Sequence, residues 1–358
     1  MRITSVVYHV RATLRYTDTM EVHTSIPLKN YTTMRLGGPA RFMAEVRSAD
    51  DLPTLYKNAH AQNLPIFVLG GGSNVIAHDE GFDGIVLRVR IPGFEIIEDI
   101  ASTTTIKIGA GELWDDVVRR TVEMNLSGIE AMSAIPGTAG ACPVQNVGAY
   151  GQEIADTLQS LEAYDSHTDT FVTLSAADCG FSYRHSIFRG DAMGRYFITS
   201  ITLLLSKAAP QPPFYAALQT YLDNNAITMF TPQVIRDAVT AIRADKLPDP
   251  KTRPNTGSFF KNAIVEKWQL DNLCNDYPDA PSFDMGGGRY KVPSGWLIEN
   301  AGFKGELIAG MRVNAKNALV LINESATSYS DLATARDTII RGVRDAFRIE
   351  ISQEPLEL

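Results

Sequence analysis

The sequence predicts a mixed α+β protein with more than one domain, and three observations support this prediction. The chain has 358 residues, which is long enough for two or three domains that each bury a core of their own. Apolar runs typical of strands and amphipathic patterns typical of helices both occur along it. A proline-rich linker at residues 208–213 interrupts these patterns, and we place a domain boundary there.

The composition is that of an ordinary soluble globular protein, with 44% apolar and 21% charged residues. The net charge of −8 argues against a large nucleic-acid footprint. The six histidines show no metal-binding spacing, so no metal site is expected. Three irregularly spaced cysteines fit a reducing compartment, where Cys142, Cys179 and Cys274 act as small apolar residues.

Neither a membrane span nor a secretory signal is expected. No apolar run approaches the roughly 20 residues that cross a bilayer. The first 20 residues contain arginines but no long apolar stretch and no small-residue cleavage site. We interpret residues 1–30 as an N-terminal extension, within which Met20 is an alternative start and the residues before it are disordered.

In the first half, a capping pattern at residues 48–51 predicts a helix that continues to about residue 62. A second helix is expected over residues 114–124, with Leu113, Val117, Val118 and Val122 on its inner side. Apolar runs predict the strands, of which the first is expected to be buried. In chain order they are residues 65–69, 84–89, 106–110, 158–164, 170–174 and 197–205.

In the second half, Thr231 before Pro232 predicts the start of a helix that runs to about residue 245. Residues 318–322 read as a buried strand. Ser330 is expected to cap a last helix that ends near Phe347, followed by a strand at residues 348–352. The inward residues of the two helices are Ile235, Ala238, Val239 and Ile242, and Leu332, Ala335, Ile339, Val343 and Phe347.

Two loops rich in small residues are candidates for a phosphate cradle. The glycine loop, residues 70–74, reads Gly-Gly-Gly-Ser-Asn and follows a strand, so its backbone N–H groups can converge on an anion. It lacks the spacing of a Rossmann turn, and the next strand comes too soon for a crossover helix. Taken alone, such a loop is more often merely a tight turn.

The second loop, the small-residue loop at residues 136–151, strengthens this hypothesis because the two loops together can wrap one long ligand with a diphosphate. Gln145 and Asn146 can hydrogen-bond the edge of a heterocycle. A flavin dinucleotide fits better than a nucleoside triphosphate, since there is no Gly-Lys-Ser/Thr sequence to hold terminal phosphates and magnesium.

Further candidates lie outside the two loops. Residues 246–262 combine prolines, lysines, Ser258 beside Gly257, and an asparagine, which suits a polar ligand but also a solvated surface turn. Arg184 lies between aromatic residues and can clamp a carboxylate, or form a surface ion pair. Glu354 follows a predicted strand that brings it back to the fold, although a terminal acid is usually solvated. We interpret His185 as a bystander and Cys142 as a packing residue.

Seven ordered motifs make the chain resemble the family of UDP-N-acetylenolpyruvoylglucosamine reductases, and the match runs from about residue 31 to residue 354. They are Leu69-Gly-Gly-Gly-Ser-Asn74, Ile135-Pro-Gly137 with Gln145-Asn-Val-Gly-Ala-Tyr-Gly151, Tyr183-Arg-His-Ser-Ile-Phe188, Lys246-Leu-Pro-Asp-Pro250, Gly257-Ser-Phe-Phe-Lys-Asn262, Gly295-Trp-Leu-Ile298 and Ala318-Leu-Val-Leu-Ile-Asn323.

The resemblance implies a two-lobed FAD-binding domain of the vanillyl-alcohol-oxidase type at residues 31–207. It implies an α+β substrate-binding domain at 208–346, and a C-terminal strand and tail at 347–358. It also implies noncovalent FAD, and NADPH as co-substrate. The implied reaction turns UDP-N-acetylglucosamine enolpyruvate into UDP-N-acetylmuramate in cytoplasmic peptidoglycan precursor synthesis. The protein is expected to be a monomer without metal, nucleic acid or membrane partners.

The resemblance also assigns site residues. Arg184, Ser258 as proton donor and Glu354 match the catalytic positions of the family. The positions that hold the UDP-sugar are matched by Tyr183, Tyr215, Lys246 and Asn262. Those that hold the cofactor are matched by Gly70, Gly71, Gly72, Ser73, Asn74, Pro136, Gly137, Gln145, Asn146, Gly148 and Ala149. One departure weakens the match of Tyr215, since the chain has Tyr215-Ala-Ala-Leu218 where the family usually has Tyr-Gly-Asp/Glu-Leu.

Two other functions stay open at this point. One is an FAD oxidase of the same flavin superfamily, but those enzymes often bond the flavin to a histidine in the glycine loop. The glycine loop here has none, and His78 lies beyond it. The other is a non-catalytic module that binds a flavin or a nucleotide sugar, against which the joint presence of Arg184, Ser258 and Glu354 argues.

Overall fold

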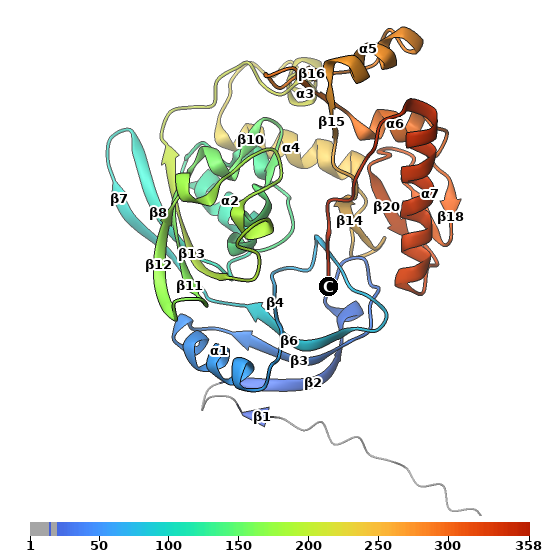
Figure 1. Ribbon diagram of the computed structural model, residues 1–358. Helices are drawn as coiled ribbons and strands as arrows, with labels where there is room; N and C mark the ends of the chain where they lie inside the picture. Colours follow the sequence, from blue (N-terminus) through green and yellow to red (C-terminus); the bar gives the residue numbers. More distant parts are fainter. Residues whose placement is uncertain (1–13, 16–19) are drawn as a thin grey trace, which may run out of the picture.

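The computed structural model describes residues 14–15 and 20–358 (Figure 1). Met20, the proposed alternative start, is the first residue of the longer described range. The disorder predicted before it concerns residues that, apart from 14–15, lie outside the described residues. Part of the predicted N-terminal extension is described, and there β2 (Glu21–Pro27) is a strand of a sheet. Among the described residues, no helix combines the length and the apolar character that crossing a membrane requires.

The first sheet has the strand order β1-β2-β3-β6-β4. Its bounds are Leu14–Arg15 for β1, Pro39–Val46 for β3, Phe82–Val89 for β6 and Ile66–Leu69 for β4. Strands β3 and β4 both run parallel to β6, and α1 (Leu52–Ala61) leads from β3 to β4. The connection from β4 to β6 contains the glycine loop and the short strand β5 (Val75–Ile76) instead of a helix, as the exclusion of a Rossmann unit predicts.

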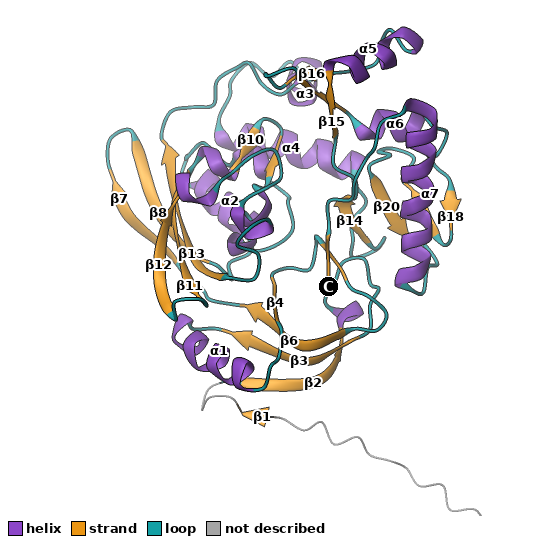
Figure 2. Ribbon diagram, viewed as in Figure 1, coloured by secondary structure: helices purple, strands orange, loops and turns teal. Residues whose placement is uncertain are grey.

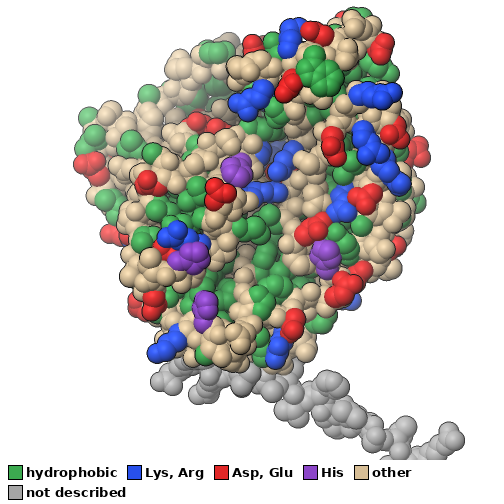
Figure 3. Space-filling model, viewed as in Figure 1, with side chains coloured by type: hydrophobic (Ala, Val, Ile, Leu, Met, Phe, Trp, Pro, Cys, Tyr) green, Lys and Arg blue, Asp and Glu red, His purple; other side chains and the backbone are tan. Residues whose placement is uncertain are grey.

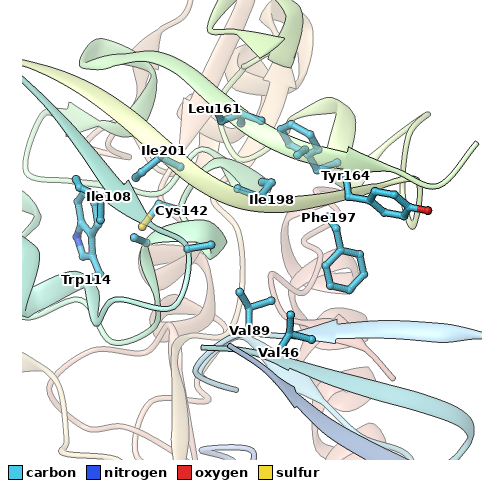
Figure 4. Close-up of a cluster of buried hydrophobic side chains, with 14 of the residues drawn as sticks. Val46, Val89, Ile108, Trp114, Cys142, Leu161, Tyr164, Phe197, Ile198 and Ile201 are labelled. Carbon is cyan, nitrogen blue, oxygen red and sulfur yellow. The ribbon is translucent and has the colours of Figure 1, made fainter. Parts of the chain in front are cut away.

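The second sheet is antiparallel throughout, with the order β12-β11-β13-β8-β7. Its bounds are Thr170–Ser175, Leu158–Asp165, Tyr196–Ser206, Thr103–Gly109 and Phe94–Asp99. The two sheets share one core, in which Val46 and Val89 of the first face Phe197 and Ile198 of the second (Figure 4). Helix α2 (Trp114–Glu123) buries Trp114 completely, and the indole N–H donates to the Met132 carbonyl at 3.2 Å.

The rest of the described chain adds helices, a four-stranded sheet and a three-stranded sheet, besides two short two-stranded pairs (Figure 2). Helices α3 (Ala216–Asn224) and α4 (Pro232–Lys246) form a cluster that includes Ala131. One sheet has the order β14-β20-β19-β18, with bounds Asn255–Ser258, Val320–Asn323, Met311–Val313 and Leu307–Ile308. The other has the order β15-β17-β16, with bounds Ala263–Glu266, Arg289–Val292 and Phe283–Asp284. The other helices are α5 (Lys267–Asp276), α6 (Ser294–Asn300) and α7 (Tyr329–Phe347).

Most predicted elements are present. Thr231 caps α4 by accepting a hydrogen bond from the Val234 amide at 3.2 Å, and all the inward residues predicted for α4 and α7 are buried. Helices α3, α5 and α6 were not predicted. They bury few residues each, for example only Leu270 and Leu273 in α5, so their apolar periodicity is weak.

Three predicted details are wrong: the residue that caps the last helix, the inward position of Leu113, and the burial of the strand at residues 65–69. Ser328, and not Ser330, caps α7, because its side chain and that of Asp331 form a reciprocal capping box. Leu113 is 51% exposed, because it precedes α2 in an extended conformation and does not lie on its inner face. Within β4, Leu69 is buried but Val68 is 38% exposed, because this strand borders a cavity.

The predicted strand at residues 348–352 is also absent. The segment is irregular, although Ile349 and Ile351 are buried. The chain pairs with residues 259–261 only from Ser352 onward, at residues 352–354, through two backbone hydrogen bonds and one bridge. The last strand is β21 (Leu356–Glu357), which pairs in parallel with β5 directly after the glycine loop. The end of the described chain therefore pairs with the segment that follows the glycine loop.

Candidate active site

A cavity of about 260 Å³, which we call the central cavity, lies where the glycine loop, the small-residue loop, β14 and the C-terminal segment meet. Figure 3 shows a hollow down the middle of this face, with apolar side chains along it and lysines and arginines at its upper end. Most of the predicted site residues line the central cavity. They are Gly70, Gly71, Gly72, Ser73, Asn74, Pro136, Gly137, Gln145, Gly148, Arg184, Ser258 and Glu354.

The glycine loop needs its glycines. A Cβ on Gly71 would lie 2.8 Å from the Cα of Gly137, so the two loops could not approach as they do. Gly72 has φ +68°, and a Cβ there would overlap the Tyr31 carbonyl oxygen at 1.9 Å. The loops are also joined by side chains, since the Ser73 hydroxyl donates to the Pro136 carbonyl at 3.3 Å. They form a wall of exposed backbone, which is suited to a diphosphate.

A second cavity of about 160 Å³ adjoins the central cavity and shares part of its wall, including Gly70 and Thr138. Its lining is mostly apolar, with Tyr56, Met193 and Tyr196 among its residues. Two adjoining cavities with glycine backbone at their junction suit a long ligand that is polar in the middle and apolar at an end. FAD has this form, so the residues present fit an FAD that spans both cavities.

Arg243 adds an independent observation in favour of a bound polar ligand. It lies on α4 and lines the central cavity, and its Nε is buried without a hydrogen-bond partner among the described residues. Burial lowers its pKa, while Tyr150 and Asp115 act in the opposite direction. A buried guanidinium N–H without a partner is costly, which indicates an acceptor on a ligand. The sequence interpretation missed Arg243, although its position three residues before Lys246 was a usable signal.

Arg184 is held in an uncommon backbone conformation, with φ +103°. Its guanidinium donates to the carbonyls of Asn146 and Gly148 at 3.0 and 2.8 Å. These two bonds fix the guanidinium plane from the side of the small-residue loop. A guanidinium has five N–H donors, so others remain for a ligand in the cavity.

Ser258 is the last residue of β14, which pairs with β20 across a register shift. Gly257 before it has φ +72° and open space where a Cβ would be. This irregular strand end presents Ser258 to the central cavity, where it lies among the same lining residues as Arg184 and Glu354.

Glu354 has an environment that opposes ionisation. Burial raises the pKa of its carboxyl, and Arg184, Arg189 and Lys261 counteract this only in part. The carboxylate accepts a hydrogen bond from the Gln145 side chain at 3.2 Å. The backbone N–H of Glu354 donates to the Phe259 carbonyl at 2.8 Å, which fixes the residue against β14.

Gln145 and Arg189 form a network behind Glu354 that the sequence did not predict. The Gln145 side-chain oxygen accepts from Asn74 and from Arg189, the latter at 2.8 Å. Arg189 also donates to the main-chain oxygen of Glu354. Burial lowers the pKa of Arg189, and the Glu354 charge opposes this shift. The predicted role of Gln145 at a heterocycle is untested, but its amide group already connects three elements of the site.

The residues predicted for the UDP-sugar do not line the central cavity. Asn262 donates to the Tyr183 hydroxyl at 3.0 Å and accepts from the Ser294 amide at 3.1 Å. Tyr215 is 50% exposed and meets Tyr150 edge-on, with ring centroids 5.9 Å apart.

Lys246 is exposed at the end of α4, next to Leu247. Leu247 lines a third cavity of about 360 Å³, which shares Arg243 and Gly257 with the central cavity.

Two predicted cofactor residues are also set back from the cavity lining. Asn146 is fully buried with φ +49°, and its side chain bonds the Ser182 carbonyl and the Ala155 amide at 3.3 and 3.2 Å. Ala149 lies in the short strand β9 (Gly148–Ala149), which pairs with β10 (Gln152–Glu153). Among the described residues there is no cluster of His, Cys, Asp or Glu that could hold a metal ion.

Comparisons with known proteins give matches for two parts of the chain. A family model described as an FAD binding domain matches residues 40–175, which include both loops. A second, described as the C-terminal domain of UDP-N-acetylenolpyruvoylglucosamine reductase, matches residues 249–357, which include Ser258 and Glu354.

The UDP-N-acetylenolpyruvoylglucosamine reductase of Ralstonia nicotianae is 41% identical over 333 residues, covering 92% of this chain and 97% of the relative. The enzyme of that name from Neisseria gonorrhoeae is 38% identical over 329 residues, covering 92% and 95%. The crystal structure of UDP-N-acetylenolpyruvylglucosamine reductase from Thermus caldophilus has the same fold, with a TM-score of 0.65, 23% identity and coverage of 94% and 99%. The predicted α+β fold with an FAD-binding domain is thus confirmed, and the chain belongs to the UDP-N-acetylenolpyruvoylglucosamine reductase family.

Proposed function

We propose that this protein reduces UDP-N-acetylglucosamine enolpyruvate to UDP-N-acetylmuramate with NADPH, through noncovalently bound FAD. One observation carries the proposal. Arg184, Ser258 and Glu354 are far apart in the sequence, yet they line one cavity whose wall is the glycine loop of the FAD-binding domain. A carboxylate clamp, a hydroxyl and an acid around one cavity suit a substrate with an enolpyruvyl group.

FAD, when bound, supplies the hydride transfer from NADPH to the enolpyruvyl double bond. The two loops would hold its diphosphate through their backbone N–H groups, and the unpaired Nε–H of Arg243 would donate to an acceptor of the cofactor or the substrate. No histidine is among the residues that line the central cavity or its neighbour, in the described part of the chain. His78, the nearest to the glycine loop in sequence, stacks on Tyr329 at 3.8 Å instead. These placements support noncovalent binding.

Arg184 holds the substrate carboxylate. Its guanidinium is fixed by two backbone carbonyls, so little freedom is lost when a carboxylate binds the remaining N–H groups. Reduction of the enolpyruvyl carbon leaves negative charge that spreads into this carboxylate. Arg184 stabilises that charge because its guanidinium is already fixed at the place where the charge develops.

Ser258 donates the proton that completes the reduction, and Glu354 holds the enol form. A serine hydroxyl is a poor acid, but the carbanionic carbon next to it is strongly basic. Glu354 is suited to share a proton with the enol, because burial raises its pKa.

We further propose that Tyr183, Tyr215, Lys246 and Asn262 bind the UDP-sugar outside the central cavity. Tyr183 and Asn262 are already hydrogen-bonded to each other, and the Lys291 ammonium lies 5.1 Å from the Tyr183 ring centroid. This places positive charge near an aromatic ring, as the binding of a nucleotide diphosphate requires. Three free cysteines agree with a reducing location, and we place the reaction in the cytoplasm with the protein acting as a monomer.

The test is NADPH oxidation by the purified yellow protein, with and without UDP-N-acetylglucosamine enolpyruvate. We expect fast oxidation only with the sugar, and UDP-N-acetylmuramate as product. Acid precipitation should release the yellow colour. NADPH oxidation that is independent of the sugar and consumes oxygen would favour the oxidase alternative. A protein that binds both ligands without turnover would be a binding module.

A further inference from the structure

The segment that carries Glu354 is attached by a very short strand to β5, which directly follows the glycine loop. Strand β21 has two residues, with Leu356 opposite Val75 and Glu357 opposite Ile76 of β5. The amides of Leu356 and Leu358 donate to the carbonyls of Asn74 and Ile76 at 3.0 and 2.8 Å. A backbone hydrogen bond contributes little net stability, because ordering the residues that form it costs a comparable amount of entropy. The pairing alone therefore holds the segment weakly.

Glu357 strengthens this attachment with a set of side-chain contacts. One carboxylate oxygen accepts hydrogen bonds from Arg336 Nη1 at 2.6 Å, the Tyr329 hydroxyl at 2.9 Å and Gln353 Nε2 at 3.0 Å. The other oxygen lies 3.2 Å from His78 Nε2. We call Glu357 and these four partners the Glu357 anchor.

The Glu357 anchor joins three parts of the chain. Tyr329 and Arg336 belong to α7, His78 follows β5, and Gln353 directly precedes Glu354. The Tyr329 backbone N–H also donates to the Asp79 carboxylate at 2.8 Å, so the start of α7 is fixed to the segment after β5. Burial opposes the ionisation of Glu357, but hydrogen bonds from Tyr329, Gln353 and His78 outweigh it and lower the pKa of its carboxyl. The Glu357 carboxyl is thus ionised near neutral pH.

We propose that Glu357 is a positioning residue for Glu354, which fixes the last strand so that the Glu354 carboxylate stays in the central cavity. The proposal rests on the role of Glu354 in the proposed function. Glu357 does not line the central cavity itself, since Leu356 and Glu354 are the lining residues of this segment. Glu357 acts through the backbone that links it to Glu354. Gln353, which precedes Glu354 in the chain, adds a second link because its side chain also contacts Glu357.

The experiment measures the two half-reactions of the FAD-loaded enzyme by stopped-flow absorbance in Glu357→Gln. Gln keeps the shape but loses the negative charge that pairs with Arg336, and it replaces one acceptor oxygen with an N–H donor. We expect reoxidation by the enolpyruvyl sugar to slow by about 10- to 100-fold, as for a small misplacement of a reacting group. Flavin reduction by NADPH should stay within about twofold of the unchanged enzyme, because the contact between the two loops, from Ser73 to Pro136, does not involve the C-terminal strand.

A double-mutant cycle shows whether Glu357 acts through Glu354. In a Glu354→Gln background there is no carboxylate left to position, so adding Glu357→Gln should slow reoxidation by less than about twofold. Equal factors in both backgrounds would overturn the proposal, because Glu357 would then act independently. Tyr329→Phe removes one of the four contacts without changing a charge. It should slow the same half-reaction more mildly, and it serves if Glu357→Gln does not fold.

Glu324→Gln is the matched control. Its carboxylate is paired with Arg312 and Arg253 at 2.7 and 3.5 Å and is 32% exposed, against 33% for Glu357, but it lies after β20. It should leave both half-reactions unchanged. Hydrogen–deuterium exchange of the peptide that spans residues 350–358 should be faster in Glu357→Gln and unchanged in Glu324→Gln.

The outcomes separate this proposal from the proposed function. If Glu354→Gln itself reoxidises at the normal rate, the assigned role of Glu354 is wrong. If Glu354→Gln is slow while Glu357→Gln is normal and its exchange is unaltered, only the positioning role of Glu357 is wrong.

Discussion

Asp165 and Glu354 both lie largely out of water beside arginines, yet their surroundings shift their pKa values in opposite directions. Asp165, in β11 of the second sheet, is 2% exposed. Arg195 binds it with two hydrogen bonds of 2.9 and 2.6 Å, and the His167 amide adds a third at 3.0 Å. The hydrogen bonds from Arg195 hold the pKa of Asp165 well below its usual range, against the effect of burial.

Glu354 has two arginines nearby but no such pairing. Arg184 donates to backbone carbonyls, and Arg189 to Gln145 and to the main-chain oxygen of Glu354. Among the described residues, Gln145 is the side chain that donates to its carboxylate. Burial therefore dominates, and the pKa of Glu354 is raised. The comparison teaches that an arginine near a buried acid outweighs the effect of burial when it donates to that acid, and offsets burial only in part when it does not. In the site, the guanidinium of Arg184 and the carboxylate of Glu354 are both left available for a substrate.

The largest effect is expected for Ser258→Ala, which removes the proposed proton donor on the wall of the same cavity. Reoxidation of the flavin by the enolpyruvyl sugar should slow by about 10²–10⁴-fold, or roughly 3–5 kcal/mol of activation free energy. Flavin reduction by NADPH should stay near normal in the same stopped-flow traces. Ser200→Ala, a buried serine that hydrogen-bonds Glu162 at 3.0 Å, is the control and should change neither half. Slower reduction with normal reoxidation would show that the role given to Ser258 is wrong.

The next effect concerns Asp165, where the change should affect stability and not chemistry. Asp165→Asn should lower the free energy of unfolding by about 2 kcal/mol, less than for a fully buried pair because Arg195 is 34% exposed. The pKa of Asp165 is lowered by folding, so its ionised form stabilises the protein above the ordinary Asp range and this stabilisation is lost as the pH falls. Thermal unfolding should thus show a difference at pH 7 that shrinks near pH 3. A constant difference would mean that the ion pair is not its cause.

The smallest expected effect is a gain in stability when Glu354 is replaced by Gln, which is opposite in sign to the effect expected for Asp165. Folding raises the pKa of Glu354, so this group stabilises the folded protein fully at pH values below the ordinary pKa range of Glu. That stabilisation is lost as the pH rises. Gln resembles the protonated acid at every pH. Glu354→Gln should therefore be more stable than the unchanged protein by about 1 kcal/mol at pH 8, with no difference near pH 4. Thermal unfolding at both values measures this, and a Gln variant that is less stable at pH 8 would contradict the comparison.

The sequence predicted the parts of the fold that repeat a local pattern. The capped helix from Thr231 and the apolar face of α7 were readable because each depends on residues close in the chain. The predicted strand at residues 348–352 failed because its apolar residues are buried in an irregular segment, and pairing with residues 259–261 begins only at residue 352. Short helices such as α5 were missed because they bury too little to show a period.

The candidate site was predicted mainly by family resemblance, and its supporting contacts were not. Gln145 reaches Glu354 across 209 positions, and Arg189 reaches the same residue across 165. No local pattern encodes such pairings. The exposed backbone of Gly70–Gly72 was readable from composition, but the orphaned Nε of Arg243 became visible only once α4 was placed beside the cavity.

The most direct test of the central claim compares single-turnover reoxidation of the reduced flavin in Glu354→Gln and Asp165→Asn. Both variants carry a neutral amide in place of an acid that lies beside an arginine. If Glu354 is the acid available to the substrate, its variant should reoxidise about 10²–10⁴-fold more slowly with the enolpyruvyl sugar. Asp165→Asn should reoxidise at the rate of the unchanged protein, and NADPH should reduce both variants normally. Normal reoxidation in Glu354→Gln, or equal slowing in both, would contradict the account.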